Sequence, residues 1–320
     1  MPVLLTILIL LLLFVIYLSF YFFYSPKVKK KNLNITELSE TIEIDGVTRS
    51  FHAVIPKAHV EKMPLIFVFH GTMQKGKTIR KAVGYEFDEI AESNGVIIVY
   101  PDAYKGSWND ARKVGDYPAR IENIDETKFV KQMIAYFESK YHVDPHCVFG
   151  VGFSNGGQLI HRLASNISQE FKGLAAIMAT HPTMDNFIGN GTGGEVPMLL
   201  VAGTDDHTVP YHGGLIQLFF LKPRGLAMSA YKTAEFYAKR NGISSPPTVE
   251  FLPHLEQSGN TAVIRATYRD TDKKTVELYT AAGIGHVFPN KYNRFPRIMG
   301  KSTFDLDTPY VIWSFFKQYI

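Results

Sequence analysis

One serine between two glycines constrains this chain more than any other feature. The stretch Gly152-Phe153-Ser154-Asn155-Gly156 fits the pattern G-x-S-x-G, with an apolar run at 147–151 before it and a helix-like stretch at 158–164 after it. A strand, a sharp turn carrying serine and a helix place a hydroxyl at the top of an α/β sheet, where it serves as a nucleophile. A side chain at either glycine would collide with the neighbouring strand or helix. The surrounding pattern therefore predicts that Ser154 is a nucleophile.

Buried strands alternate with helical segments along most of the chain. Continuous apolar runs, typical of strands covered on both faces, lie at 64–70, 95–100, 148–151, 174–179 and 196–202. Helical spacing occurs at 78–93, 126–141, 226–241 and 309–319, and hairpins are expected around Asp45-Gly46 and 272–274. The alternation predicts an α/β fold with a mostly parallel sheet flanked by helices, in one domain over residues 40–320.

The first 24 residues are almost wholly apolar and carry no charged side chain. As a helix they would rise about 36 Å, enough to cross a bilayer core of about 30 Å. Secretory signals usually have a basic start, a shorter apolar run and small residues at a cleavage site, none of which is present. We therefore expect a transmembrane or signal-anchor segment over 1–24 and a linker over 25–39; secretion after cleavage is the alternative.

The sequence constrains the side of the membrane on which the domain lies less than it constrains the presence of an anchor. Four lysines within residues 27–31 follow the span, and the positive-inside rule would keep them, with the domain, on the cytosolic side. Sequons at Asn34, Asn166 and Asn190 would instead suit a lumenal domain. The charge pattern favours the cytosolic side and the sequons leave it open.

Composition argues against a nucleic-acid surface and against an intramolecular disulfide bond. The net charge is +4, and the lysine cluster at 27–31 accounts for it, so no nucleic-acid surface is predicted. The single cysteine, Cys147, sits in an apolar run and is expected to be a small buried side chain. No intramolecular disulfide is possible with one cysteine.

A serine nucleophile needs a base, and the base needs an acidic partner that holds its tautomer. On α/β sheets with a serine elbow these follow in the order Ser, Asp or Glu, His. Asp205 and Asp206 come directly after a buried strand, and His286 follows Gly283 and Gly285 after the last strand. Of eleven histidines, His286 has the right order and position. Spacing alone does not choose between the two aspartates.

A tetrahedral intermediate also needs two backbone donors. One is the N–H of the residue after the nucleophile, Asn155. The other comes from the loop after an early strand, where His70-Gly71-Thr72 stands, so Thr72 N–H is the second expected donor. His70 precedes Ser154 and is expected to pack in that loop instead of acting as the base.

Residues spread over the whole domain carry a resemblance to one family. They are His70-Gly71, Tyr100-Pro101-Asp102, 106–110 with Arg112, Asp125-Glu126, Val143-Asp144-Pro145, 154–157, Gly203-Thr204 with Asp206, Val209-Pro210-Tyr211, Gly285-His286 with Pro289, and Trp313 with Phe315-Phe316. With these the chain resembles the esterase/polyhydroxybutyrate-depolymerase family, whose relatives include feruloyl esterases and acetyl xylan esterases of the carbohydrate esterase family 1 type. The resemblance implies an α/β-hydrolase fold preceded by the N-terminal helix.

The resemblance also implies a site and an activity. It selects Asp206 over Asp205, giving a Ser154–Asp206–His286 triad that hydrolyses feruloyl-, acetyl- or hydroxyalkanoate-type esters without a metal or cofactor. A peptidase or amidase on the same fold, or a non-catalytic binding protein, are the alternatives. Thr72 stands where the family usually has Cys, and Phe288 where Trp is common.

Three aromatic residues and one apolar segment are the expected substrate contacts. Trp108, Tyr211 and Phe288 are predicted to bind substrate, although for Trp108 a packing anchor for its own loop is the favoured interpretation. Residues 213–228 are apolar and follow the acid loop, so they would form a lid, an acyl-binding wall or a helix packed on the sheet.

Overall fold

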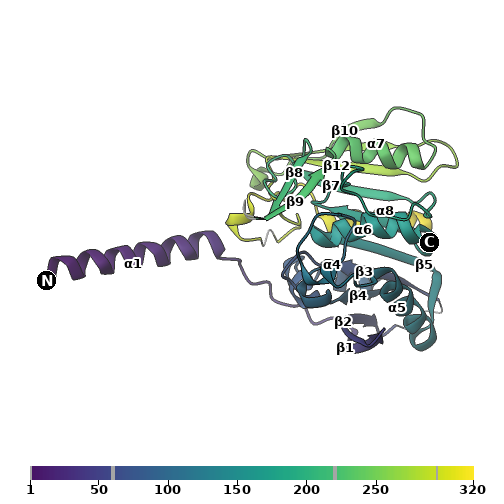
Figure 1. Cartoon of the computed structure of the whole chain (residues 1–320), viewed down its shortest axis with the longest axis horizontal. Coiled ribbons are helices and arrows are strands. Elements are labelled where there is room, and N and C mark those ends of the chain that lie inside the picture. The colour runs from purple at the N-terminus through teal and green to yellow at the C-terminus, as the bar shows by residue number, and fades with distance from the viewer. Residues whose placement is uncertain (1, 59–61, 219–221, 293–294) are drawn as a thin grey trace.

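A ten-stranded sheet runs through the domain (Figure 1). The computed structural model describes all residues except 1, 59–61, 219–221 and 293–294. The strands follow the order β1-β2-β4-β3-β5-β6-β7-β12-β11-β10. The six central strands are parallel: β4 (Ile97–Pro101), β3 (Met63–Phe69), β5 (Val143–Phe153), β6 (Gly173–Ile177), β7 (Met198–Gly203) and β12 (Val276–Ala282).

Antiparallel strands complete both edges of the sheet. On one side lie β1 (Ile35–Ile44) and β2 (Val47–Pro56), and on the other β11 (Ala262–Tyr268) and β10 (Thr248–Phe251). Asp45 and Gly46 both have positive φ at the β1–β2 turn, as an Asp-Gly hairpin requires. The predicted α/β fold with a mostly parallel sheet is confirmed.

Helices cover the sheet on both faces and divide the core into two apolar layers. One face carries α5 (Glu126–Tyr141), α6 (Asn155–Ile167) and α7 (Ala230–Arg240); the other carries α2 (Gly76–Ala82), α3 (Glu86–Asn94) and α8 (Thr308–Phe316). Along β3, Leu65, Phe67 and Phe69 enter the first layer, whereas Ile66 and Val68 enter the second. This two-sided burial explains why the strand is a continuous apolar run.

Two segments differ from the expected elements. The helix expected over 78–93 is two helices, α2 and α3, because Tyr85 takes a left-handed conformation (φ 63°) between them. The helix expected from residue 226 begins only at Ala230. Before it, β8 (Gly214–Leu218) and β9 (Lys222–Ala227) pair antiparallel as a hairpin, so the described residues of 213–228 contain strands and no helix. A short helix, α4 (Pro118–Ile121), precedes α5.

The N-terminal helix α1 (Pro2–Phe23) projects away from the domain (Figure 1). Val3–Phe23 has a mean hydropathy of 3.1, and none of it is buried against the domain. A helix of this length and composition is either a signal sequence or an anchor. The sheet begins at Ile35, inside the segment expected to be linker.

The linker is docked on the domain by polar contacts. Lys31 Nζ lies 2.9 Å from Glu89 Oε2, Lys30 pairs with Glu37, and the Asn34 N–H donates to Glu92. These partners belong to β1 and α3, so the chain is held against the domain before the first strand begins.

Candidate active site

Ser154 stands on a sharp turn between β5 and α6. Its backbone has φ 55° and ψ −115°, and its N–H donates to Ile177 O at 2.9 Å. A Cβ at Gly152 would lie 2.1 Å from Gly156 O, and one at Gly156 would lie 2.3 Å from Phe69 O. Both glycines are therefore required by close backbone approach, and the strand–turn–helix arrangement expected around Ser154 is present.

One hydrogen-bonded chain links Ser154, His286 and Asp206. His286 Nε2 lies 2.8 Å from Ser154 Oγ, and His286 Nδ1 lies 2.7 Å from Asp206 Oδ2. A carboxylate accepts only, so it places the imidazole proton on Nδ1 and leaves Nε2 to accept from the serine hydroxyl. His286 and Asp206 are each 5% exposed. The arrangement can take a proton from Ser154 and stabilise the resulting imidazolium.

The loop after β7 presents Asp206, and not Asp205, to the histidine. Asp206 Oδ1 accepts the N–H groups of Thr208 and Val209 at 2.8 and 2.9 Å, which leaves Oδ2 for His286. Asp205 is exposed and accepts a hydrogen bond from the Thr204 hydroxyl. Asp206, which the resemblance implied, is thus the aspartate that contacts His286.

His70 fixes the loop that carries Thr72. Its Nδ1 lies 2.7 Å from Gly71 O, and its Nε2 accepts the Ala103 N–H at 3.0 Å. Burial lowers the pKa of His70 to about 4, so the ring stays neutral with Nδ1 as the donor. In a trans peptide the C=O and the next N–H point in opposite directions. Because Gly71 O is held by His70, Thr72 N–H points the other way, and Thr72 lines the notch at Ser154.

Asn155 has its side chain turned into the core. Its Oδ1 accepts the Trp108 N–H at 2.8 Å, and its Nδ2 donates to Asp110 and to Trp108 O. Asn155 is the first residue of α6, where a backbone N–H has no partner within the helix. The two expected donors, Thr72 N–H and Asn155 N–H, therefore both belong to residues at the edge of the same notch.

The notch itself is small and lies beneath the β8–β9 hairpin. Its volume is about 20 Å³, and its lining residues are Thr72, Arg112, Ser154, Asn155, Gln158, Thr208, Val209, Ile216 and Arg224. Ile216 packs with Val209 and Ala227 in a small apolar cluster. Together with the bond from Gln217 N–H to Thr208 O at 3.1 Å, this packing holds the hairpin on the acid loop.

The three aromatic residues expected to bind substrate are not among the described residues that line the notch. Trp108 and Phe288 have no exposed surface and Tyr211 is 8% exposed. The Trp108 indole N–H donates to His70 O at 2.8 Å, and the Tyr211 hydroxyl bonds to Thr280 Oγ1 at 2.9 Å. Phe288 packs near Phe153. Their burial favours packing over substrate contact, and for Trp108 it favours the anchor interpretation.

Two arginines in the notch were not among the predicted site residues. Arg112 appeared in the sequence only as part of a motif, two residues after Asp110. Arg224 lies in the segment expected to be a lid or wall, and nothing in its local sequence marks it. Its position depends on the fold of the hairpin.

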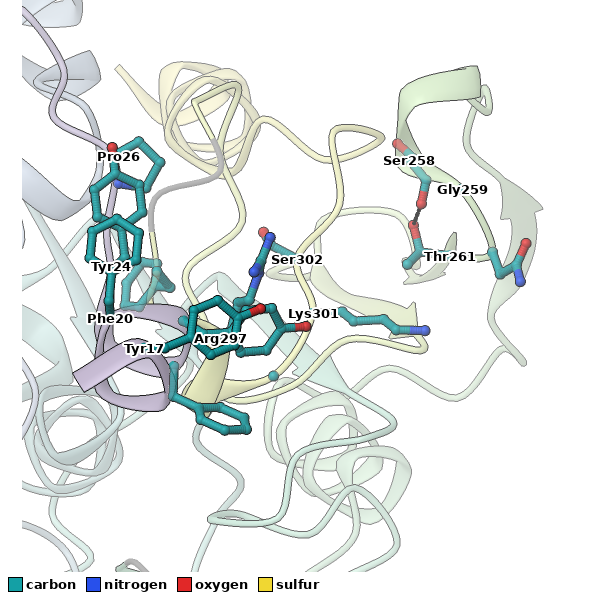
Figure 2. Close-up of a pocket in the computed structure, with 15 residues that line it drawn as sticks. Tyr17, Phe20, Tyr24, Pro26, Ser258, Gly259, Thr261, Arg297, Lys301 and Ser302 are labelled. Carbon is teal, nitrogen blue, oxygen red and sulfur yellow. Dashed lines mark hydrogen bonds between the residues drawn. The ribbon is translucent and has the colours of Figure 1, made fainter. Parts of the chain in front are cut away.

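A larger cavity lies elsewhere, between the end of α1 and the loop 295–302 (Figure 2). It has a volume of about 1090 Å³ and shares no lining residue with the notch at Ser154. Arg297 lies over the Tyr21 ring at 4.4 Å, which connects the helix to this loop. Within the described part of the chain, no three His, Cys, Asp or Glu side chains are grouped to hold a metal ion.

Comparisons with known proteins identify distant relatives. No family model matches the chain. The chain is 23% identical over 296 residues to NocK of Nocardia uniformis subsp. tsuyamanensis, a provisionally assigned esterase; the match covers 89% of this chain and 84% of NocK. It is 27% identical over 187 residues to feruloyl esterase B of Piromyces equi, covering 58% of this chain but only 33% of that protein.

A solved structure shares the fold. The acetyl xylan esterase from Aspergillus awamori superimposes with a TM-score of 0.55 at 15% identity, covering 79% of this chain and 95% of that one. The chain is also 26% identical over 168 residues to the bifunctional acetylxylan esterase/xylanase XynS20E of Neocallimastix patriciarum, and this match covers 22% of that protein. The chain is thus a distant relative of esterases of the α/β-hydrolase fold, among them feruloyl and acetylxylan esterases.

Proposed function

We propose that this protein is a serine esterase. Ser154 Oγ attacks the ester carbonyl while His286 Nε2 takes its proton, and Asp206 holds the imidazole and offsets its charge. The N–H groups of Thr72 and Asn155 stabilise the oxyanion. His286 then protonates the leaving alcohol, and water, activated by the same histidine, releases the acid from Ser154.

The observation that carries the proposal is the unbroken chain of hydrogen bonds from Ser154 Oγ through His286 to Asp206. It supports the esterase interpretation over a binding protein, which would have no use for a serine hydroxyl aligned on a base. The esterase relatives support ester substrates over peptides.

A short acyl group is the substrate feature that the notch supports best. About 20 Å³ is room for roughly one water-sized group next to Ser154. An acetyl methyl group fits this space, whereas a hydroxycinnamoyl ring requires the β8–β9 hairpin to move. We therefore place short-chain esters, such as acetyl esters of saccharides, ahead of feruloyl esters and hydroxyalkanoate oligomers.

Active-site labelling and an ester panel test the proposal. A fluorophosphonate probe should label the folded protein and fail to label Ser154→Ala. 4-Nitrophenyl acetate should be hydrolysed faster than peptide 4-nitroanilides. Turnover of the anilides alone would favour a peptidase, and no labelling of folded wild-type protein would favour a non-catalytic binding protein.

The proposal includes an anchored form of the enzyme. The apolar helix α1 is long enough to span a bilayer, and none of its described residues is buried in the domain. We place the domain on the cytosolic side, because the lysines at 27–31 directly follow the helix.

A further inference from the structure

Two buried arginines line the notch beside the proposed nucleophile. Arg112 is 5% exposed and Arg224 is 6% exposed. A neutral acyl group makes no use of a second guanidinium at this place. We propose that the acyl part of the substrate carries a carboxylate, and that Arg224 binds it; this inference rests on the proposed esterase function.

Arg112 is already neutralised by a neighbouring carboxylate. Its Nε lies 3.2 and 3.1 Å from the two oxygens of Asp110, and its Nη2 also pairs with Asp110. Asp110 is fully buried and also accepts from Asn155 Nδ2. Arg112 and Asp110 together therefore add no net charge to the notch, and Arg112 helps to hold Asn155 in place.

Arg224, in contrast, has no anionic partner among the described residues. Its side chain makes no hydrogen bond or ion pair with them, and its Nη1 is buried without an acceptor. It packs on the Tyr117 ring, at 4.5 Å. The nearby Asp116 is at the surface, 4.0 Å from Lys222. Burial, and then the charge of Arg112, lower the pKa of Arg224. A buried, unpaired guanidinium is unfavourable until an anion binds it.

The fold holds Arg224 in this unfavourable position. Asn186 Nδ2 donates to the backbone oxygens of Arg224 and Leu226, while Asn186 Oδ1 accepts the Val114 N–H at 3.0 Å. A Cβ at Gly225 would lie 2.3 Å from Asn186, so the strand can approach this closely only with glycine there. Asn186 thus ties β9 to the segment that carries Arg112, and Arg224 is kept at the notch.

We place the acyl part of the ester, and not the alcohol, at the notch. The alcohol must leave beside His286, because this residue returns the proton. His286 is not among the described residues that line the notch, whereas Thr72 and Asn155, which hold the oxyanion, are. The notch holds about one water-sized group, so the methylene of a malonyl group fills it and the carboxylate beyond reaches Arg224 when the β8–β9 hairpin moves outward. The substrates that we propose are therefore half-esters of short dicarboxylic acids. The shortest one used in the test below is the malonyl half-ester.

Matched substrates and variants test the inference. Monoethyl malonate and ethyl acetoacetate differ in that a methyl ketone replaces the carboxylate, so the ratio of their kcat/KM values reports charge recognition. A hydrogen bond to a charged group contributes 1.5–3 kcal/mol, so Arg224→Met should lower this ratio about ten- to hundredfold. Arg224→Lys should retain part of the preference. Lys222→Met removes the same charge from an exposed place on the same strand and should leave the ratio unchanged.

A binding measurement separates failure of the inference from failure of the esterase proposal. Calorimetry should show that malonate binds to the Ser154→Ala protein. Adding Arg224→Met to that protein should abolish malonate binding. If neutral esters are hydrolysed and Arg224→Met leaves the ratio unchanged, water fills the notch and the inference is wrong. If no ester is hydrolysed, the esterase proposal fails, and malonate binding alone decides whether the anion site exists. Thermal unfolding of Arg224→Met serves as the folding control; its melting temperature should rise, because a buried unpaired charge is removed.

Discussion

At the scale of single residues, the proposed site depends on side chains that do not line the notch. His70 is a positioning residue: it holds Gly71 O and thereby directs Thr72 N–H. We expect His70→Ala to lower kcat about tenfold or more with little change in KM, since loss of one complete oxyanion donor costs about 10²–10³ in kcat. Steady-state kinetics on 4-nitrophenyl acetate would measure this split.

His181 offers a matched control for that variant. It is also buried, and its Nδ1 bonds to the carbonyl of the following residue, Pro182, at 2.7 Å. His181→Ala removes the same type of bond away from the notch and should lower stability while kcat is retained. Equal kcat losses in both variants would contradict a special role for His70.

A buried carboxyl group makes stability depend on pH. Burial, and then the charge of Asp307, raise the pKa of Glu86 to about 8, although Lys291 Nζ lies 3.1 Å away and opposes the shift. Between the ordinary pKa of 4.5 and this value, the folded state binds more protons than the unfolded state, so stability falls as pH rises. Glu86→Gln should flatten this fall, and the variant should gain stability over wild type as pH approaches 9.

Urea unfolding at a series of pH values from 5 to 9 would measure the effect. Glu138 is exposed on α5 and serves as the control: Glu138→Gln should keep the wild-type pH dependence. A Glu86→Gln protein with the same slope as wild type would show that Glu86 does not cause the loss.

Residue order was enough to propose part of the candidate site. The contact between Ser154 and His286 could be expected because a strand, a turn and a fixed chain order mark these two residues. Asp206 could not be separated from Asp205 by spacing, since both follow β7; the resemblance selected Asp206, and in the structure its bonds to His286, Thr208 and Val209 distinguish it. Arg224 could not be predicted because its burial results from a hairpin folding onto Asn186, a contact between distant segments.

At the scale of elements, the elbow is the most tightly packed junction of the site. Gly156→Ala would place a methyl group 2.3 Å from Phe69 O, at the end of the strand that leads to the His70 loop. Overpacking of this kind costs about 1–3 kcal/mol. We expect lower stability and a large loss of activity, because β3 must move away from the elbow.

Gly194 provides the matched control for the elbow variant. A Cβ there meets no atom within 4 Å. Gly194→Ala should change the free energy of unfolding by less than about 0.5 kcal/mol. Urea denaturation, with fluorophosphonate labelling of both variants, would compare them; wild-type labelling rates in Gly156→Ala would contradict the packing argument.

Elements differed in how well the sequence predicted them. The central strands were predictable because burial on both faces leaves continuous apolar runs, and α5 was predictable from its spacing and from Asp125, which caps it. The β8–β9 hairpin was not, because a short apolar stretch with glycines is compatible with strand or helix. Tyr85, which divides the helix expected over 78–93, takes positive φ without being glycine.

At the scale of the whole molecule, we expect the apolar helix to determine membrane association and the domain to contain the proposed active site. None of Val3–Phe23 is buried, and the notch is built wholly from residues of the domain. We expect the full chain to remain in the membrane pellet after alkaline carbonate extraction. A chain cleaved after the helix would instead appear in the soluble fraction. Glycosidase treatment, read as a gel shift that depends on Asn34, Asn166 or Asn190, would place the domain in the lumen and contradict the cytosolic orientation.

The docked linker sets how far the proposed active site can lie from an anchoring membrane. Lys30, Lys31 and Asn34 hold the chain on the domain, so only residues 24–29 lie between α1 and the first docked lysine. Even fully extended, this connecting segment reaches about 20 Å. In the anchored form, the catalytic domain would stay next to the bilayer and hydrolyse esters presented there. High salt weakens exposed ion pairs, so it would release the docked lysines and lengthen the free connecting segment.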